Sequence, residues 1–208
     1  SDYNPGSENN GLLAGIQLDL GQVLSILPGL IYPDQDWSQS YNNKIPEKSG
    51  NEFIIEYTAH PEAMFHLYDQ KPIPLSDLTN RISIIRSIKP AYQKVKIRVI
   101  DKEGGKAVPV KFHAHGESGE LLVPVDRHRQ PNYSWFADYS VDYVNQGSHT
   151  CTYIPGETLI NLPLGKVFIE ISKGFEIAPV RKVFEISGDT EVISVEIEKA
   201  LHWREKGW

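Results

Sequence analysis

Two histidines separated by a single alanine are the first feature whose spacing suggests chemistry. His113 and His115 lie in a segment with strand-like alternation. Side chains two residues apart on a β-strand point to the same face, so the two imidazoles could chelate one metal ion. Asp126, His128 and His149 follow along the chain and add possible ligands. Such a pair also arises easily by chance, and we favour the alternative that it belongs to a polar outer face, at a sheet edge or a domain interface.

An aromatic stretch is the second candidate for a binding site. Tyr133, Trp135, Phe136 and Tyr139 are interleaved with aspartates in a polar region. Aromatic ring faces can cover the apolar C–H surface of a sugar while carboxylates accept hydrogen bonds from its hydroxyls, so the stretch could bind carbohydrate. We favour the alternative that these rings cap one end of the fold or pack on a neighbouring domain, because aromatic side chains bury about 150–250 Å² each.

The remaining polar motifs do not predict catalysis. Ser148 and His149 are adjacent in sequence, but adjacency does not give the geometry of a catalytic triad. Glu120 and Glu157 each follow a glycine, and no spacing pairs them, so we expect solvated surface carboxylates. The sequence contains no glycine-rich phosphate loop and no zinc-finger spacing. We therefore predict no catalytic residue and no cofactor within the chain.

Composition narrows the class of protein. The chain has 208 residues, with 21 Lys and Arg against 27 Asp and Glu, and a formal net charge of −6. This acidic balance disfavours nucleic acid as a partner. The longest apolar run is far shorter than the roughly 18 residues of a membrane span, so no membrane partner is expected. Cys151 is the single cysteine and cannot form an internal disulfide.

The second half of the chain carries the strand pattern that would position these groups. Apolar residues alternate with polar ones in short runs separated by glycine and turn residues, and no amphipathic helix of about ten residues is present. The expected strands cover residues 95–100, 108–115, 121–125, 158–162, 167–171, 180–186 and 193–197. Residues 126–150 read as a long loop. We predict an all-β chain folded as an antiparallel β-sandwich.

The first half is less regular. Residues 12–27 alternate like a strand, whereas residues 28–51 contain several prolines and read as a long loop. Short strands are expected around Phe53, Phe65 and Ile82. We place a boundary near residues 88–90. This gives a mostly β N-terminal segment or small domain over 1–88, a sandwich over 89–200 and a linker over 201–208.

The chain from about residue 91 to its end resembles a known family. The similarity rests on several short stretches taken together, at residues 94–99, 108–116, 123–129, 152–158, 162–167, 171–176 and 203–208. They resemble the β-sandwich region that precedes the catalytic domain of carbaryl-hydrolase-like proteins. These proteins belong to the polymerase and histidinol phosphatase (PHP) superfamily of metallohydrolases.

The resemblance implies a prealbumin-like or carboxypeptidase-regulatory-like sandwich that serves as a non-catalytic accessory domain. In the family, a Gly-Trp pair like Gly207-Trp208 leads into an Asp-x-His-x-His metal motif, which these 208 residues do not contain. The implied partner is a C-terminal hydrolase domain of the same polypeptide, and Trp203 and Trp208 are candidates for the contact with it. The alternative functions are a carbohydrate-binding module and a small metal-binding protein.

Overall fold

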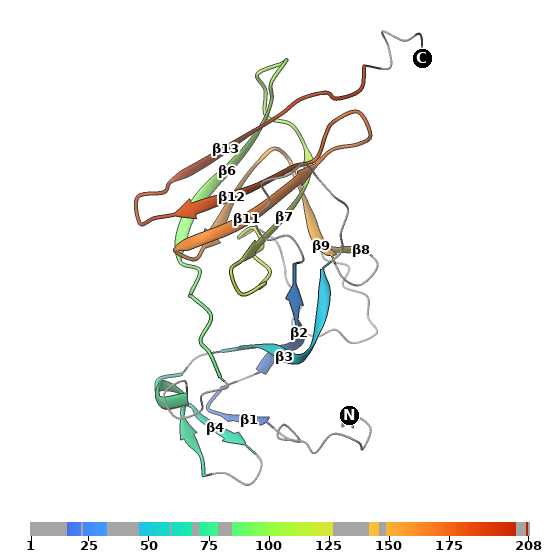
Figure 1. Ribbon diagram of the computed structural model, residues 1–208. Helices are drawn as coiled ribbons and strands as arrows, with labels where there is room; N and C mark the ends of the chain where they lie inside the picture. The colour runs from blue at the N-terminus through green and yellow to red at the C-terminus, as the bar shows by residue number, and fades with distance from the viewer. Residues whose placement is uncertain are drawn as a thin grey trace. The chain divides into compact units, whose positions relative to one another are not determined.

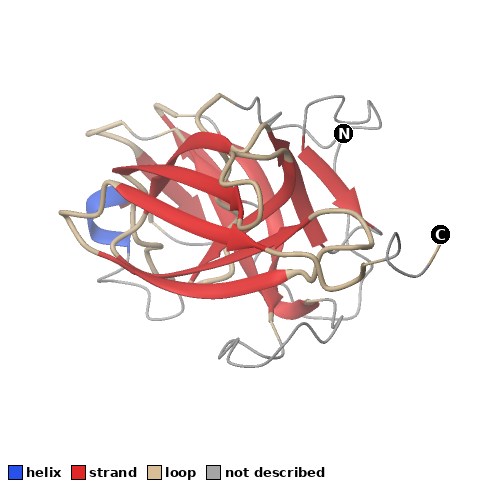
Figure 2. Cartoon of the chain, turned by 90° about the horizontal axis from the view of Figure 1, so that it is seen from above, coloured by secondary structure: helices blue, strands red, loops and turns tan. Residues whose placement is uncertain are grey.

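The computed structural model describes residues 16–21, 23–32, 46–58, 60–67, 71–78, 85–126, 142–145, 149–202 and 207. Over these residues the chain forms β-strands and one 3-10 turn at Leu75–Asp77 (Figures 1 and 2). The chain divides into two compact units, one made of residues 1–26 and 55–87 and the other of residues 27–54 and 88–208. The predicted all-β class is confirmed. One division lies between Ser87 and Ile88, beside the expected boundary, but residues 27–54 group with the second half.

The second unit contains two sheets that pack face to face. One is three-stranded, with the order β10(Glu157–Leu162), β6(Gln93–Asp101) and β13(Val192–Ile197). The other is five-stranded, with the order β12(Val180–Ile186), β11(Gly165–Ser172), β7(Val110–Gly116), β9(His149–Ile154) and β8(Asp142–Asn145). The sheets are linked by short turns, such as the one that follows Asp101 at the end of β6.

A single hydrophobic core lies between the two sheets. The buried side chains of the three-stranded sheet come from alternate positions of its strands: Val95, Ile97, Val99, Ile160, Leu162, Ile193, Val195 and Ile197. The five-stranded sheet contributes Val110, Phe112, Ala114, Ile154, Val167, Ile169, Ile171 and Ile186. Apolar side chains at every second position of a strand share one face, so the alternation read from the sequence is what closes this sandwich.

One strand pair differs from the antiparallel arrangement that we expected. β13 runs parallel to β6, with Ile193 beside Ile97 and Val195 beside Val99, whereas β10 runs antiparallel to the other side of β6. The alternation of side chains is the same in both cases, so the sequence pattern does not reveal strand direction. β13 reaches this position by crossing from the five-stranded sheet after β12.

The long loop predicted over residues 28–51 is wrong at both ends. β2(Val23–Ile31) and β3(Glu47–Tyr57) form a two-stranded ribbon that includes residues from each end of that range. Pro28 lies inside β2. Proline lacks a backbone N–H but is tolerated in a strand with an open edge. The prolines in this range therefore did not justify the prediction of a loop.

Two further predictions need correction around residues 121–150. Part of the expected loop over 126–150 is strand, namely β8 and the start of β9. The expected strand over 121–125 is instead irregular backbone with isolated bridges, from Leu121 to His115 and from Pro124 to Ile160. The Pro124 nitrogen has no hydrogen to donate, which prevents a continuous ladder there.

The first unit is a small sheet. It has the order β1(Ile16–Asp19), β4(Met64–Leu67) and β5(Ile73–Pro74), with the 3-10 turn following β5. Phe65, Ile73 and Leu78 form its buried cluster. His66 of β4 contacts the Asp19 carboxylate of β1 at 2.9 Å on the exposed side. The strand predicted around Ile82 lies outside the described residues.

Candidate functional site

The histidine pair is buried on the outer face of the five-stranded sheet. β7 is the third of its five strands, and His113 and His115 lie on the face opposite Phe112 and Ala114, as the alternation predicts. His113 is 3% exposed and His115 is fully buried. The expected position at a sheet edge is therefore wrong, and the expected polar outer face is covered rather than open to water.

Three aromatic rings form a stack through His115. The ring of Tyr32 lies parallel to that of His115, with centroids 3.6 Å apart and planes 6° apart. On the other side, Phe168 of β11 stacks on His115 at 4.9 Å and 4°. Phe168 is also the direct cross-strand partner of His115 in the sheet. The imidazole is thus enclosed between two hydrophobic rings, one from its own sheet and one from the segment that ends β2.

Hydrogen bonds join the same residues. His113 Nε2 and His115 Nδ1 are 2.9 Å apart, and the Tyr32 hydroxyl lies 3.2 Å from His113 Nε2. A hydrogen bond between two imidazole nitrogens holds one proton, because one nitrogen must donate and the other must accept. The structure therefore fixes the histidine pair in a state in which one of the two facing nitrogens is unprotonated.

A buried ion pair flanks the histidines. Glu170 of β11 is the cross-strand partner of His113, and Arg181 of β12 is that of Glu170. Arg181 Nε and Glu170 Oε2 are 3.4 Å apart, and their side chains are 5% and 12% exposed. Burial raises the pKa of Tyr32 well above its ordinary value, and the nearby carboxylates of Glu170 and Glu120 raise it further. Tyr32 is therefore a neutral phenol in this cluster.

Tyr32 directly follows β2, and the backbone just before it passes close to the turn that follows β7. Leu30 and Tyr32 pack with Phe168 in a small hydrophobic cluster. Gly119, in the turn after β7, has φ of +76°, and a Cβ atom there would lie 2.5 Å from the carbonyl oxygen of Leu30. Glycine is the residue that fits both the left-handed backbone and this contact. We call residues Leu30–Tyr32 the docking segment.

The predicted metal site is not assembled by the described residues. Among the side chains that the structure describes, no group of three His, Cys, Asp or Glu residues could hold a metal ion. His113 and His115 bond to each other, and Asp126 contacts the hydroxyl of Thr158 at 3.3 Å. His128 lies outside the described residues, and so does the side chain of His149, although its backbone begins β9.

The predicted aromatic binding stretch also lies outside the described part of the chain. This holds for Tyr133, Trp135, Phe136 and Tyr139, and for the proposed contact residues Trp203 and Trp208. The carbohydrate-binding prediction and the two tryptophan contacts therefore stay predictions.

The two glutamates singled out in the sequence differ in environment. Glu157 is solvated as expected, and its carboxylate contacts Lys96 Nζ at 2.8 Å and Arg98 Nε at 2.7 Å, which lowers its pKa. Glu120 is half-buried, and burial raises its pKa. One Glu120 oxygen accepts a hydrogen bond from the backbone N–H of Ser118 at 3.0 Å, so this carboxylate stabilises the turn after β7.

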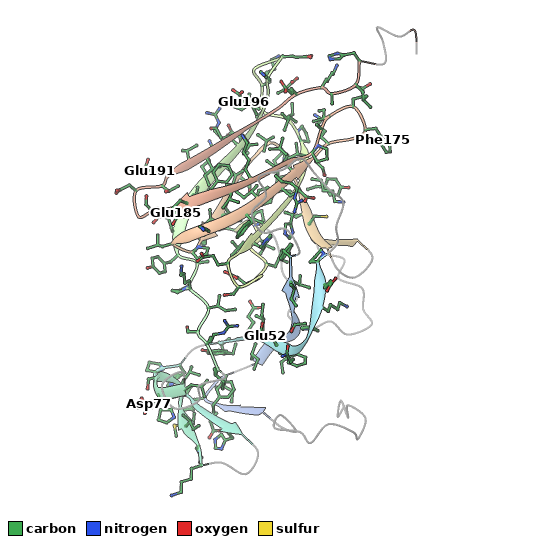
Figure 3. The ribbon with its side chains drawn as sticks, in the orientation of Figure 1. Glu52, Asp77, Phe175, Glu185, Glu191 and Glu196 are labelled. Atoms are coloured by element: carbon green, nitrogen blue, oxygen red, sulfur yellow. The ribbon has the colours of Figure 1, made fainter. Side chains whose placement is uncertain are left out.

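A second feature lies where β11 connects to β12, and the sequence reading missed it. The carbonyl oxygen of Glu176 accepts hydrogen bonds from the backbone N–H groups of Ala200 at 2.7 Å and Leu201 at 3.1 Å. Beside this clamp, Phe175 is 95% exposed, and Figure 3 labels it on the loop next to the last described strand and its continuation. Gly174, with φ of +57°, makes the tight turn that precedes Phe175, and no motif in the sequence marks this phenylalanine.

Comparisons with protein-family models, with curated proteins and with solved structures gave no match. None of the helical segments in the described residues has the length and apolar character needed to cross a membrane.

Proposed function

We propose that this chain is a non-catalytic β-sandwich module that packs against, and positions, the catalytic domain of a larger metal-dependent hydrolase. The identity of that partner comes from the resemblance of residues 91–208 to the region that precedes the catalytic domain in carbaryl-hydrolase-like PHP proteins. The exposed Phe175 beside the clamped segment that follows β13 is the observation that carries the proposal.

A phenylalanine that is 95% exposed is unusual on a protein surface because its ring leaves a large apolar area in water. Aromatic anchors of this kind carry much of the binding energy where they enter a pocket on a partner. The neighbouring Leu201 is 39% exposed and extends the apolar surface. Phe175 and Leu201 therefore provide a small apolar contact for a following domain.

The clamp explains how such a contact could be held at a defined position. Besides the two hydrogen bonds to Glu176, Ile177 forms a bridge with Lys199. These contacts continue the path of the chain beyond β13 along the sandwich. A domain attached after this point would start from a fixed position beside Phe175, which reduces the entropy lost when it docks.

A binding titration tests the proposal. The 208-residue chain is titrated calorimetrically with a separately produced hydrolase domain of the proposed type, and then Phe175→Ser is titrated in the same way. Phe175→Ser should weaken binding by at least about tenfold, because an aromatic anchor typically contributes 2 kcal/mol or more. Tyr92→Ser is the matched control, since Tyr92 is 65% exposed and lies just before Gln93, at the start of β6 and away from Phe175.

The same titration can contradict the proposal. Equal binding by wild type and Phe175→Ser would remove Phe175 as the contact. Absence of binding by the wild-type chain would contradict the accessory-domain assignment itself.

A further inference from the structure

We propose that the His113–His115 pair is an acid-sensitive latch, which holds the docking segment on the five-stranded sheet at neutral pH and releases it when the imidazoles take up protons. This inference goes beyond the proposed accessory function and does not depend on it.

A hydrogen bond joins the two imidazoles. His113 Nε2 and His115 Nδ1 face each other at 2.9 Å with room for one proton. If both rings became imidazolium, both facing nitrogens would carry hydrogens, and the contact would become repulsive. The docked arrangement therefore cannot hold both histidines in the charged form.

The charges around the histidine pair also oppose its protonation in the docked state. Among the described side chains, the charged and titratable ones on this face or next to it come from β7, the strands paired with it and the adjoining segments: Lys111, Tyr32, Glu120, Cys151, Tyr153, Glu170 and Arg181. Tyr32 is a neutral phenol and Cys151 is buried, so among these described side chains the charged ones are Lys111, Arg181, Glu120 and Glu170. A proton taken up by an imidazole adds a positive charge to this buried cluster, which already contains the Arg181 guanidinium. Glu120 adds to this effect, since burial raises its pKa and its negative charge is lost early on acidification.

The docking segment is held on the sheet through the two histidines. Tyr32 stacks on His115 and its hydroxyl reaches His113. When the docking segment moves away, water reaches both imidazoles and stabilises their charged forms. The released state then binds more protons than the docked state, so acidification favours release by linkage.

The size of the effect follows from the ordinary histidine pKa of about 6.5. Between about pH 7.5 and about pH 5.5, one proton taken up on release raises the opening constant about tenfold, and two protons raise it about a hundredfold. Release would uncover the aromatic face formed by His115 and Phe168.

Hydrogen exchange measured by mass spectrometry tests the latch. Labelling times are scaled for the intrinsic effect of pH, and peptides that contain the docking segment are compared with peptides from β13. We expect protection of the docking segment to fall at least about tenfold between about pH 7.5 and about pH 5.5. Protection of β13 should stay higher than that of the docking segment at both pH values, because its residues lie in the sandwich core and exchange only by global unfolding.

Variants separate the histidine effect from other titrations. The double substitution His113→Gln and His115→Phe keeps an aromatic ring in the stack and removes both titrating groups, so its docking segment should show a constant protection over the same range. His60→Gln removes an exposed imidazole of the first unit and should behave as wild type.

Two results would overturn the latch. The first is constant protection of the wild-type docking segment across the range, and this measurement decides the question even if the double variant does not fold. The second is a loss of protection in the double variant equal to that of wild type.

Discussion

Tyr32 illustrates how one side chain can fix a segment to a sheet from a distance of 81 positions along the sequence. Its ring covers His115 and its hydroxyl reaches His113. No periodic pattern links position 32 with positions 113 and 115. The alternation in β7 correctly predicted which face the two histidines occupy, but it could not predict what covers that face.

Substitution of Tyr32 separates the ring from the hydroxyl. Tyr32→Phe keeps the stack and loses the contact with His113, so we expect the free energy of unfolding to fall by about 1 kcal/mol. Tyr32→Ala loses the stacked ring as well and should cost about 3 kcal/mol. Urea denaturation followed by circular dichroism measures both. Equal losses in the two variants would show that the ring stack contributes nothing to stability.

Glu120 predicts a pH effect with a definite sign. Burial raises its pKa in the folded state, so the folded protein binds this proton more tightly than the unfolded chain does. The favourable contribution is fully present below the unfolded pKa of about 4.5 and is lost as the pH rises through the raised folded pKa. Glu120→Gln removes this loss and keeps an oxygen that can accept from the Ser118 N–H.

The measurement for Glu120 is the melting temperature at about pH 4 and at about pH 7. The variant should gain stability relative to wild type at the higher pH and little at the lower pH. A variant that is less stable than wild type at the higher pH would contradict the assigned sign.

At the scale of the elements, the sequence predicted most core strands because their apolar residues alternate. It failed where local chemistry interrupts or imitates that pattern. Pro28 lies within β2 although proline suggested a loop, and Pro124 interrupts a run that otherwise resembles a strand. The parallel pairing of β13 with β6 was not foreseen because side-chain alternation is identical in parallel and antiparallel strands.

The turn after β7 provides a test of how the docking segment is held. Gly119→Ala introduces a Cβ atom 2.5 Å from the Leu30 carbonyl oxygen at a φ of +76°. The left-handed backbone alone costs an alanine about 1–2 kcal/mol, and relief of the contact requires the docking segment to shift. Thermal unfolding and hydrogen exchange of residues 30–32 would report both effects.

Gly188→Ala is the matched control for this turn. A Cβ atom at Gly188 meets no atom within 4 Å, and its φ lies outside the left-handed range. This variant should change stability by no more than about 0.5 kcal/mol. If Gly119→Ala were equally silent, the close approach of the turn to Leu30 would have no energetic importance.

At the scale of the whole molecule, one core joins the two sheets of the second unit. Ile169→Ala removes a buried side chain of the five-stranded sheet and should cost about 2–5 kcal/mol. Because Ile169 shares one cluster with Val95, Ile97 and Val99 of β6, hydrogen-exchange protection should fall in both sheets together. Loss of protection confined to β11 would show that the sheets unfold separately. Leu159→Ala, at a 39% exposed position, should have a much smaller effect.

The prediction of function from the sequence rested on fewer residues than the prediction of the fold did. The residues with suggestive chemistry, His113 and His115, are used in packing and hydrogen bonding within the sheet. Phe175 carries no motif, and only its exposure in the folded chain singles it out. Alternation reports which side chains enter the core, but it does not distinguish an exposed apolar residue from a buried one in a turn.

Turnover by the 208-residue chain itself is the most direct test of the central claim that this sandwich is a non-catalytic module. The chain is incubated with Zn²⁺ or Mn²⁺ and a panel of phosphoesters and carboxylic esters, beside a longer polypeptide in which a PHP-type hydrolase domain follows the sandwich. We predict metal-dependent hydrolysis by the longer polypeptide and none by the 208 residues alone. Metal-dependent hydrolysis by the 208 residues, lost on substitution of their own side chains, would contradict the claim.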